Sequence, residues 1–219
     1  MKKYVAEFIG TFALVFCGTG AIVIDQQSGG QVGHAGIAAT FGLIVLAMIY
    51  TFGETSGAHF NPAVSIGFWV AGKFQGKQVF PYILSQLGGA LMASGVLKLL
   101  FPSNQLLGST IPAGSNMQSF ILEFILTYFL MLVIINVSQG SRETGALAGI
   151  SIGGTVLLEA MFAGPICGAS MNPARSLAPA LVSGNMQTLW IYILAPVLGS
   201  VVATLTWKLM NPIKKIGFR

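Results

Sequence analysis

Charged side chains are scarce in this sequence of 219 residues. Only 8% of the residues are charged, against about 25% in an ordinary soluble domain, whereas 54% are apolar. So few charges cannot cover the surface of a water-soluble protein of 23.0 kDa. The mean hydropathy of +0.78 is typical of a chain whose apolar residues face lipid as well as the core. The sequence therefore predicts an integral membrane protein.

Motifs for chemistry are also missing from the sequence. The two cysteines, Cys17 and Cys167, show no metal-ligand spacing, so we expect neither a metal site nor a disulfide framework. No nucleophile–base pair, phosphate-binding loop or cofactor motif is present, which argues against an enzyme and against a bound cofactor. The net charge of +5 comes without a basic stripe of interleaved aromatics, so nucleic acid is not expected as a partner.

Six apolar runs are long enough to cross a hydrocarbon core of about 30 Å, which takes roughly 20 helical residues. These runs cover residues 4–24, 35–52, 79–101, 119–138, 147–163 and 189–210. Two further apolar pieces, residues 61–70 and 172–182, are too short to cross. The expected fold class is an all-α membrane protein with six transmembrane helices and two half-helices that enter the membrane without crossing it.

Positive charges set the expected orientation, because Lys and Arg collect in cytoplasmic connections. The termini and the second and fourth connections carry Lys2, Lys3, Lys73, Lys77, Arg142, Lys214, Lys215 and Arg219. The connections at 25–34 and 102–118 carry no Lys or Arg, and Lys98, near the outer end of the third run, is a mild exception. We therefore expect both termini in the cytoplasm. The expected location is the plasma (inner) membrane.

The two halves of the chain repeat one another. Residues 6–11 (AEFIGT) match residues 122–127 (LEFILT), and residues 56–63 (SGAHFNPA) match residues 167–174 (CGASMNPA). Each half holds three spans, an odd number, so the second half must be inverted relative to the first. We expect one channel domain over 1–219, built from inverted repeats at about 1–110 and 111–219, with its site near the membrane midplane.

Each short piece opens with the same tripeptide, namely Asn61, Pro62 and Ala63 in the first half and Asn172, Pro173 and Ala174 in the second. Asn is a favoured N-cap, and Pro fits the first helical position because its missing N–H costs nothing there. In inverted halves the two partially positive N-terminal ends would meet at the centre. Non-helical backbone before each cap is tolerable at membrane depth only where it lines an aqueous cavity, so the pattern predicts a pore.

These motifs, together with AEFIGT near the start, resemble the aquaporin and aquaglyceroporin (major intrinsic protein) family over essentially the whole chain. The stretch AGPICGASMNPARSLAPA is most similar to nodulin-type intrinsic proteins and their prokaryotic relatives. The resemblance implies a homotetramer in the lipid bilayer with one pore per subunit, which passes water and small neutral solutes.

The resemblance also implies a selectivity filter made of Phe41, Ala160, Ala169 and Arg175. An ionised group in a segment too short to reach an interface is functional by default, which independently singles out Arg175. Water-selective members typically have His at the counterpart of Ala160, and glycerol-selective ones usually have Asp where this chain has Ser176. Two alanines should leave a wider opening than a filter with His.

Two acidic residues occupy matched positions, Glu7 and Glu123. We expect them to accept hydrogen bonds from the unwound loop backbones, with proton coupling as the alternative. Glu159 has no counterpart in the first half, and the sequence assigns it no role; a place in the pore is one of its possibilities. Four glycines are expected to permit close helix packing, namely Gly88, Gly89, Gly95 and Gly199.

The function predicted from these observations is a passive channel for water and small uncharged solutes, such as glycerol, urea or metalloid hydroxides, that excludes protons and ions. One alternative is a strictly water-selective channel. The other is a secondary transporter, since transporters also use inverted repeats and broken helices.

Overall fold

The computed structural model describes residues 1–139 and 145–211. In this part of the chain, six helices are long and apolar enough to span a membrane: α1 (Lys2–Gln27), α2 (Gly33–Ser56), α4 (Gly76–Leu100), α5 (Asn116–Gln139), α7 (Ala148–Cys167) and α9 (Leu189–Met210). Two short helices, α3 (Pro62–Val70) and α8 (Pro173–Ser183), complete the described helices. The predicted fold class is confirmed. Of the charges used to predict orientation, Arg142, Lys214, Lys215 and Arg219 lie outside the described residues.

The helices before the two unwound segments run further than the apolar runs predicted. Helix α2 continues past residue 52 to Ser56, and α7 continues past residue 163 to Cys167 even though Pro165 lies in its last turn. Both end where a glycine, Gly57 or Gly168, takes the left-handed conformation with φ of 84°. A left-handed glycine is the usual helix stop, and hydropathy alone does not detect it.

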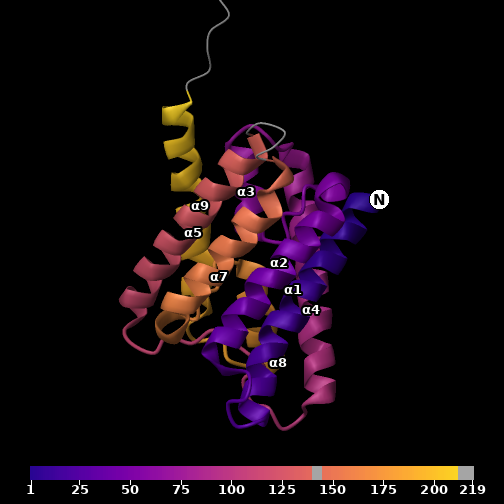
Figure 1. Cartoon of the computed structure of the whole chain (residues 1–219), viewed down its shortest axis with the longest axis vertical. Helices are drawn as coiled ribbons and strands as arrows, with labels where there is room; N and C mark the ends of the chain where they lie inside the picture. Colours follow the sequence, from indigo (N-terminus) through magenta and orange to yellow (C-terminus); the bar gives the residue numbers. More distant parts are fainter. Residues whose placement is uncertain (140–144, 212–219) are drawn as a thin grey trace, which may run out of the picture.

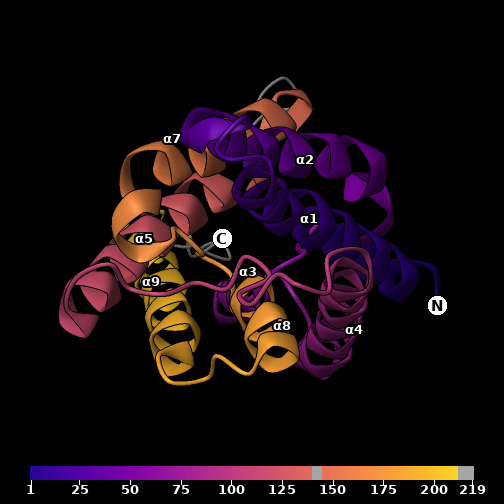
Figure 2. The same ribbon diagram turned by 90° about the horizontal axis from the view of Figure 1, so that it is seen from below.

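The short helices lie at opposite ends of the molecule's long axis, α3 in the upper half and α8 in the lower half of Figure 1. Seen from below, they form one column, with α4 and α9 on either side (Figure 2). Both short helices contact α4 and α9. The start of α1 and the end of α9 lie at the same end of the molecule (Figure 1), as an even number of crossings requires.

Two helix pairs approach so closely that a side chain would collide with backbone. A Cβ on Gly89 of α4 would overlap the carbonyl oxygen of Phe8 in α1, and a Cβ on Gly199 of α9 would overlap that of Phe124 in α5. The prediction that these glycines permit close packing is confirmed.

The prediction is wrong for Gly95, which faces open space on this chain. Gly88 meets only the edge of the Phe8 ring, at 3.3 Å, which a small rotation relieves.

Replacing Gly89 with Ala should therefore destabilise the protein, because neither backbone can yield without moving a whole helix. Overpacking of this kind costs about 1–3 kcal/mol. Thermal unfolding of the purified protein in detergent should show a lower midpoint for Gly89→Ala than for wild type. Gly95→Ala on the same helix is the matched control, and equal midpoints for the two variants would contradict the close contact.

Candidate functional site

The two short helices begin at asparagines that cap them. Asn61 and Asn172 have extended backbone, with φ of −155° and −146°. The Oδ1 atom of Asn61 accepts from Ala63 N at 2.9 Å, and that of Asn172 accepts from Ala174 N at 3.0 Å and from Arg175 N at 3.4 Å. A proline follows each asparagine at the first helical position, where it costs no hydrogen bond.

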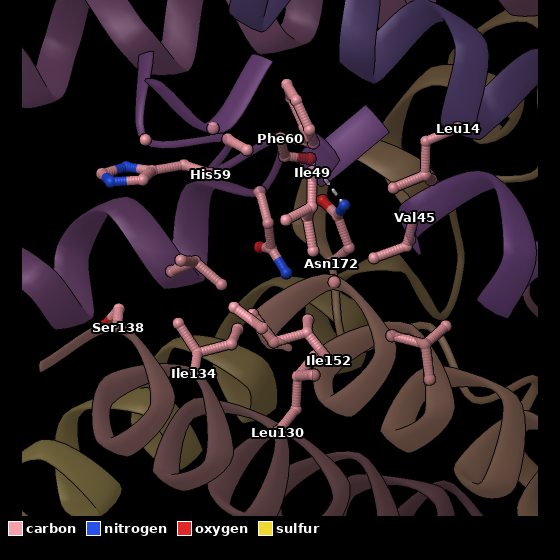
Figure 3. Close-up of a pocket in the computed structure, with 18 of the residues that line it drawn as sticks. Leu14, Val45, Ile49, His59, Phe60, Leu130, Ile134, Ser138, Ile152 and Asn172 are labelled. Atoms are coloured by element: carbon pink, nitrogen blue, oxygen red, sulfur yellow. Dashed lines mark hydrogen bonds between the residues drawn. The ribbon is translucent and has the colours of Figure 1, made fainter. Parts of the chain in front are cut away.

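The amide nitrogens of these asparagines reach across the centre of the molecule. Asn61 Nδ2 donates to the carbonyl of Met171 at 2.7 Å. Asn172 Nδ2 donates to the carbonyl of Phe60 at 2.9 Å, and both of these residues are labelled in Figure 3. The N-terminal ends of α3 and α8 therefore meet, and their dipoles add a positive potential there. Each amide carries two N–H groups. The contact across the centre uses one N–H group of each amide. The other can donate to a solute, because both asparagines line a cavity.

The unwound segments before the caps hold non-glycine residues in the left-handed region. Ala58 and Phe60 both have φ of 50°, and Ala169 and Met171 have φ of 40° and 53°. Such conformations cost on the order of 1–3 kcal/mol each and persist only where the surroundings fix them. No composition or periodicity signal identifies these four positions in advance.

Glu7 fixes the first of these segments. Its Oε1 accepts from His59 N at 3.0 Å and from Ser56 Oγ at 2.8 Å. Its Oε2 accepts from Phe60 N and from Gln86 Nε2, both at 2.8 Å. The carboxyl group is fully buried, so these bonds replace the water that the backbone N–H groups have lost.

Glu123 does the same for the second segment. Its two oxygens accept from Ser170 N at 2.7 Å and from Met171 N at 2.8 Å, and it too is fully buried. These are the contacts that the predicted loop support requires.

A cavity of about 640 Å³ runs past the asparagines. Facing the two unwound segments is an apolar wall made by Leu14, Val45, Ile49, Leu130, Ile134 and Ile152 (Figure 3). Val156 lines the same cavity. No motif in the sequence marks this wall. A signal for part of it existed, because Val45 and Ile49 follow Phe41 at intervals of four residues, the spacing of one helix face.

At one end of the cavity, Arg175 and Phe41 face one another. The Arg175 side chain is only 2% exposed, and its Cζ lies 5.0 Å from the centre of the Phe41 ring. Its Nη1 donates to the carbonyl of Gly108 at 2.8 Å, whereas its Nε has no hydrogen-bond partner. Ala169 lines the cavity beside them. The fourth predicted filter residue, Ala160, is buried one turn beyond Val156 and is not among the lining residues.

Glu159 does not line this cavity. It is 3% exposed and borders a separate groove of about 540 Å³ between α5 and α7, together with Leu126, Phe129 and Thr155 among others. Its Oε2 is buried without a hydrogen-bond partner. Across residues 1–139 and 145–211, no group of three His, Cys, Asp or Glu side chains could hold a metal ion.

Comparison with known proteins decides the family. The family model described as "Major intrinsic protein" matches residues 1–207. The chain belongs to the major intrinsic protein family. It is 44% identical to "Aquaporin NIP1-1" of Oryza sativa subsp. japonica over 96% of this chain and 75% of the relative. It is 47% identical to "Aquaporin NIP3-1" of Arabidopsis thaliana (98% and 69% covered) and 44% identical to "Nodulin-26" of Glycine max (96% and 78% covered).

The fold is also similar to a solved one. The X-ray structure of the aquaglyceroporin from Plasmodium falciparum superimposes with a TM-score of 0.85 at 28% identity, covering 94% of each chain. Membership of the family confirms that this chain is an integral membrane channel and not an enzyme, and the resemblance to nodulin-type proteins is confirmed as well.

Removing either carboxylate should destabilise the fold. Glu123→Ala leaves two buried backbone N–H groups unpaired, at roughly 1–3 kcal/mol each. Glu7→Ala removes the acceptor of two backbone N–H groups, and it also removes one of the two acceptors of Ser56 Oγ and of Gln86 Nε2. The thermal midpoint should fall in both variants, and further for Glu7→Ala.

Glutamine is the matched control, because it keeps one acceptor oxygen and should lower the midpoint less. An Ala variant that folds normally but whose solute flux no longer depends on pH would point to proton coupling in place of loop support.

Proposed function

We propose that the protein is a passive channel for water and small uncharged solutes up to about the size of glycerol. The observation that carries this proposal is the arrangement at the centre of the cavity. Two asparagine-capped helix ends meet there, each with an amide N–H left over, opposite an apolar wall. A neutral solute with a hydroxyl group finds donors on one side of this path and hydrophobic surface on the other.

The same arrangement opposes cations. Both helix N-termini carry partial positive charge, and the Arg175 guanidinium adds a full charge at one end of the cavity. In a narrow, poorly solvated passage these charges repel cations far more strongly than they would in water. We assign Asn61, Asn172, Phe41, Ala169 and Arg175 to the solute path, with Pro62, Ala63, Pro173 and Ala174 forming the two capped helix starts. Ala160 does not line the cavity itself, and we assign it to the filter because it lies one turn beyond the lining residue Val156.

Small side chains favour a wide opening. Ala169 contributes only a methyl group beside Arg175 and Phe41, and Ala160 would contribute only another. Ser176, where glycerol-selective members usually have Asp, accepts from Thr110 Oγ1 at 2.8 Å and contacts Ser170 Oγ at 2.5 Å. The hydroxyl thus binds the neighbouring loop without adding charge to the entrance.

Several family properties belong to the same proposal. They are an inverted repeat over about 1–110 and 111–219, a homotetramer with one pore per subunit, and a plasma (inner) membrane location with both termini in the cytoplasm. The repeat is supported by matched contacts, since Glu7 and Glu123 hold equivalent loop positions.

Flux measurements distinguish this function from its alternatives. Stopped-flow light scattering on proteoliposomes should show permeability to water and to glycerol, with arsenite as a third solute. Exclusion of both solutes would leave a strictly water-selective channel. A flux that saturates at millimolar solute, or that collapses with the proton gradient, would indicate a secondary transporter.

Replacing Arg175 with Val, the residue type at position 64 in the first half, should open the channel to charge. The substitution removes a fixed positive charge from a buried constriction, so proton or cation leak should rise while water flux persists. A pH-sensitive dye inside proteoliposomes measures the leak. A correctly folded variant with no new leak would count against the filter assignment.

Introducing His at Ala160 should narrow the opening. The added ring and donor should reduce glycerol permeability about tenfold or more, the scale on which a pocket rejects a slightly larger solute, while most water permeability is retained. Both are measured on the same proteoliposomes. If the His variant passes glycerol unchanged, Ala160 does not face the constriction.

A further inference from the structure

We infer that Gly18 is a positioning residue that sets the width of the filter. Because Gly18 has no side chain, the Phe41 ring can pack against α1 at this point. This inference rests on the proposed function, because it assigns Phe41 to the solute path. Gly18 lies in the middle of α1 and is buried. It does not line the cavity, so its influence must act through the residue that it touches.

The contact between Gly18 and Phe41 leaves no room for a side chain. A Cβ on Gly18 would lie 2.5 Å from Phe41 Cδ1 and 2.6 Å from Cζ, and it would overlap Cε1 as well. Separations under about 3 Å are essentially never found for real Cβ atoms, so one partner would have to move. The ring therefore packs directly against the backbone of α1, at a place where only glycine permits it.

The Phe41 ring also contacts the cation of the filter. The Arg175 Cζ lies 5.0 Å from the ring centre, within the range of a cation–π contact. The Phe41 ring thus contacts both α1 and the guanidinium, and both Phe41 and Arg175 line the cavity. A ring displaced from Gly18 must therefore change its position relative to Arg175 and to the solute path.

Helix α2 cannot retreat to make room for the ring. The residue after Phe41, Gly42, is already in close contact with α7, where its own Cβ would lie 2.6 Å from the carbonyl oxygen of Gly153. The reverse holds for a Cβ on Gly153, 2.6 Å from the carbonyl oxygen of Gly42. With α7 behind α2, a larger residue at position 18 changes the aperture and not the helix spacing.

A second aromatic ring packs against the same face of α1. A Cβ on Gly10 would lie 2.5 Å from both Cδ1 and Cζ of Phe60, whose carbonyl accepts from Asn172. Between the two glycines, Leu14 lines the cavity directly. This face of α1 therefore presents the Leu14 side chain to the path. Gly10 and Gly18, which have no side chains, leave room for the two rings beside it.

Gly18→Ala tests the inference against Gly20→Ala as the control. Gly20 is buried in the same helix, but its Cβ would meet only Leu97 Cδ2 at an ordinary 3.4 Å. Both variants gain the same methyl group and the same helix propensity. We expect Gly18→Ala to lower the ratio of glycerol to water permeability about tenfold, as one misplaced carbon does in a tight pocket, and Gly20→Ala to leave the ratio unchanged.

A second pair of variants shows whether the effect passes through the ring. In a Phe41→Ala background the ring is gone, so adding Gly18→Ala should leave the permeability ratio where Phe41→Ala alone puts it. An equal drop in both backgrounds, or equal behaviour of Gly18→Ala and Gly20→Ala, overturns the inference. If Gly18→Ala alone does not fold, the comparison of Gly18→Ala/Phe41→Ala with Phe41→Ala still decides.

A failure of the Gly18 inference can be distinguished from a failure of the proposed function. If wild type passes water but no glycerol, the broad-solute proposal fails, and the same four variants are then compared by water permeability alone. A loss of water flux in Gly18→Ala that disappears in the Phe41→Ala background still supports the inference that Gly18 acts through its contact with the Phe41 ring. A loss that persists there contradicts it.

Discussion

A backbone that leaves the helical conformation at membrane depth must find partners for its N–H and C=O groups, because lipid offers none. In this protein the two asparagines and the two buried glutamates meet that requirement. Asn61 and Asn172 donate to the carbonyls of Met171 and Phe60 across the centre, and the carboxylates accept the N–H groups of the unwound segments. The cavity lies where it does because these bonds tie the ends of α3 and α8 together.

Much of this architecture was predictable because the membrane makes hydropathy an unusually direct signal. Six runs gave six spans, and the two Asn-Pro-Ala starts gave two capped helices. The helix ends were less predictable, since α2 and α7 stop at Gly57 and Gly168 for conformational reasons and not at a change of polarity. Gly95 shows the converse limit, because a small residue in a span indicates contact only when another helix lies opposite it.

The candidate site likewise contains residues that the sequence reveals and residues that it does not. Residues whose chemistry is exceptional for a membrane, such as Arg175 and the paired glutamates, stood out in the sequence. The apolar wall did not, because Val45 or Ile152 in a span resembles any residue that faces lipid or core. The left-handed backbone at Ala58 and Ala169 was not predictable from the sequence either. Its cause is the set of hydrogen bonds made by residues distant in the sequence.

These features also distinguish the polar centre of the path from its aromatic filter. The two buried glutamates accept hydrogen bonds from the strained backbone of the unwound segments, so the donors and carbonyls at the centre have little freedom to move. The aromatic ring at the filter makes no such hydrogen bonds, and its place depends on packing against α1 and on the cation–π contact with Arg175. Changes in solute range can therefore arise from residues that merely touch the ring, without disturbing the asparagine pair that holds the two halves together.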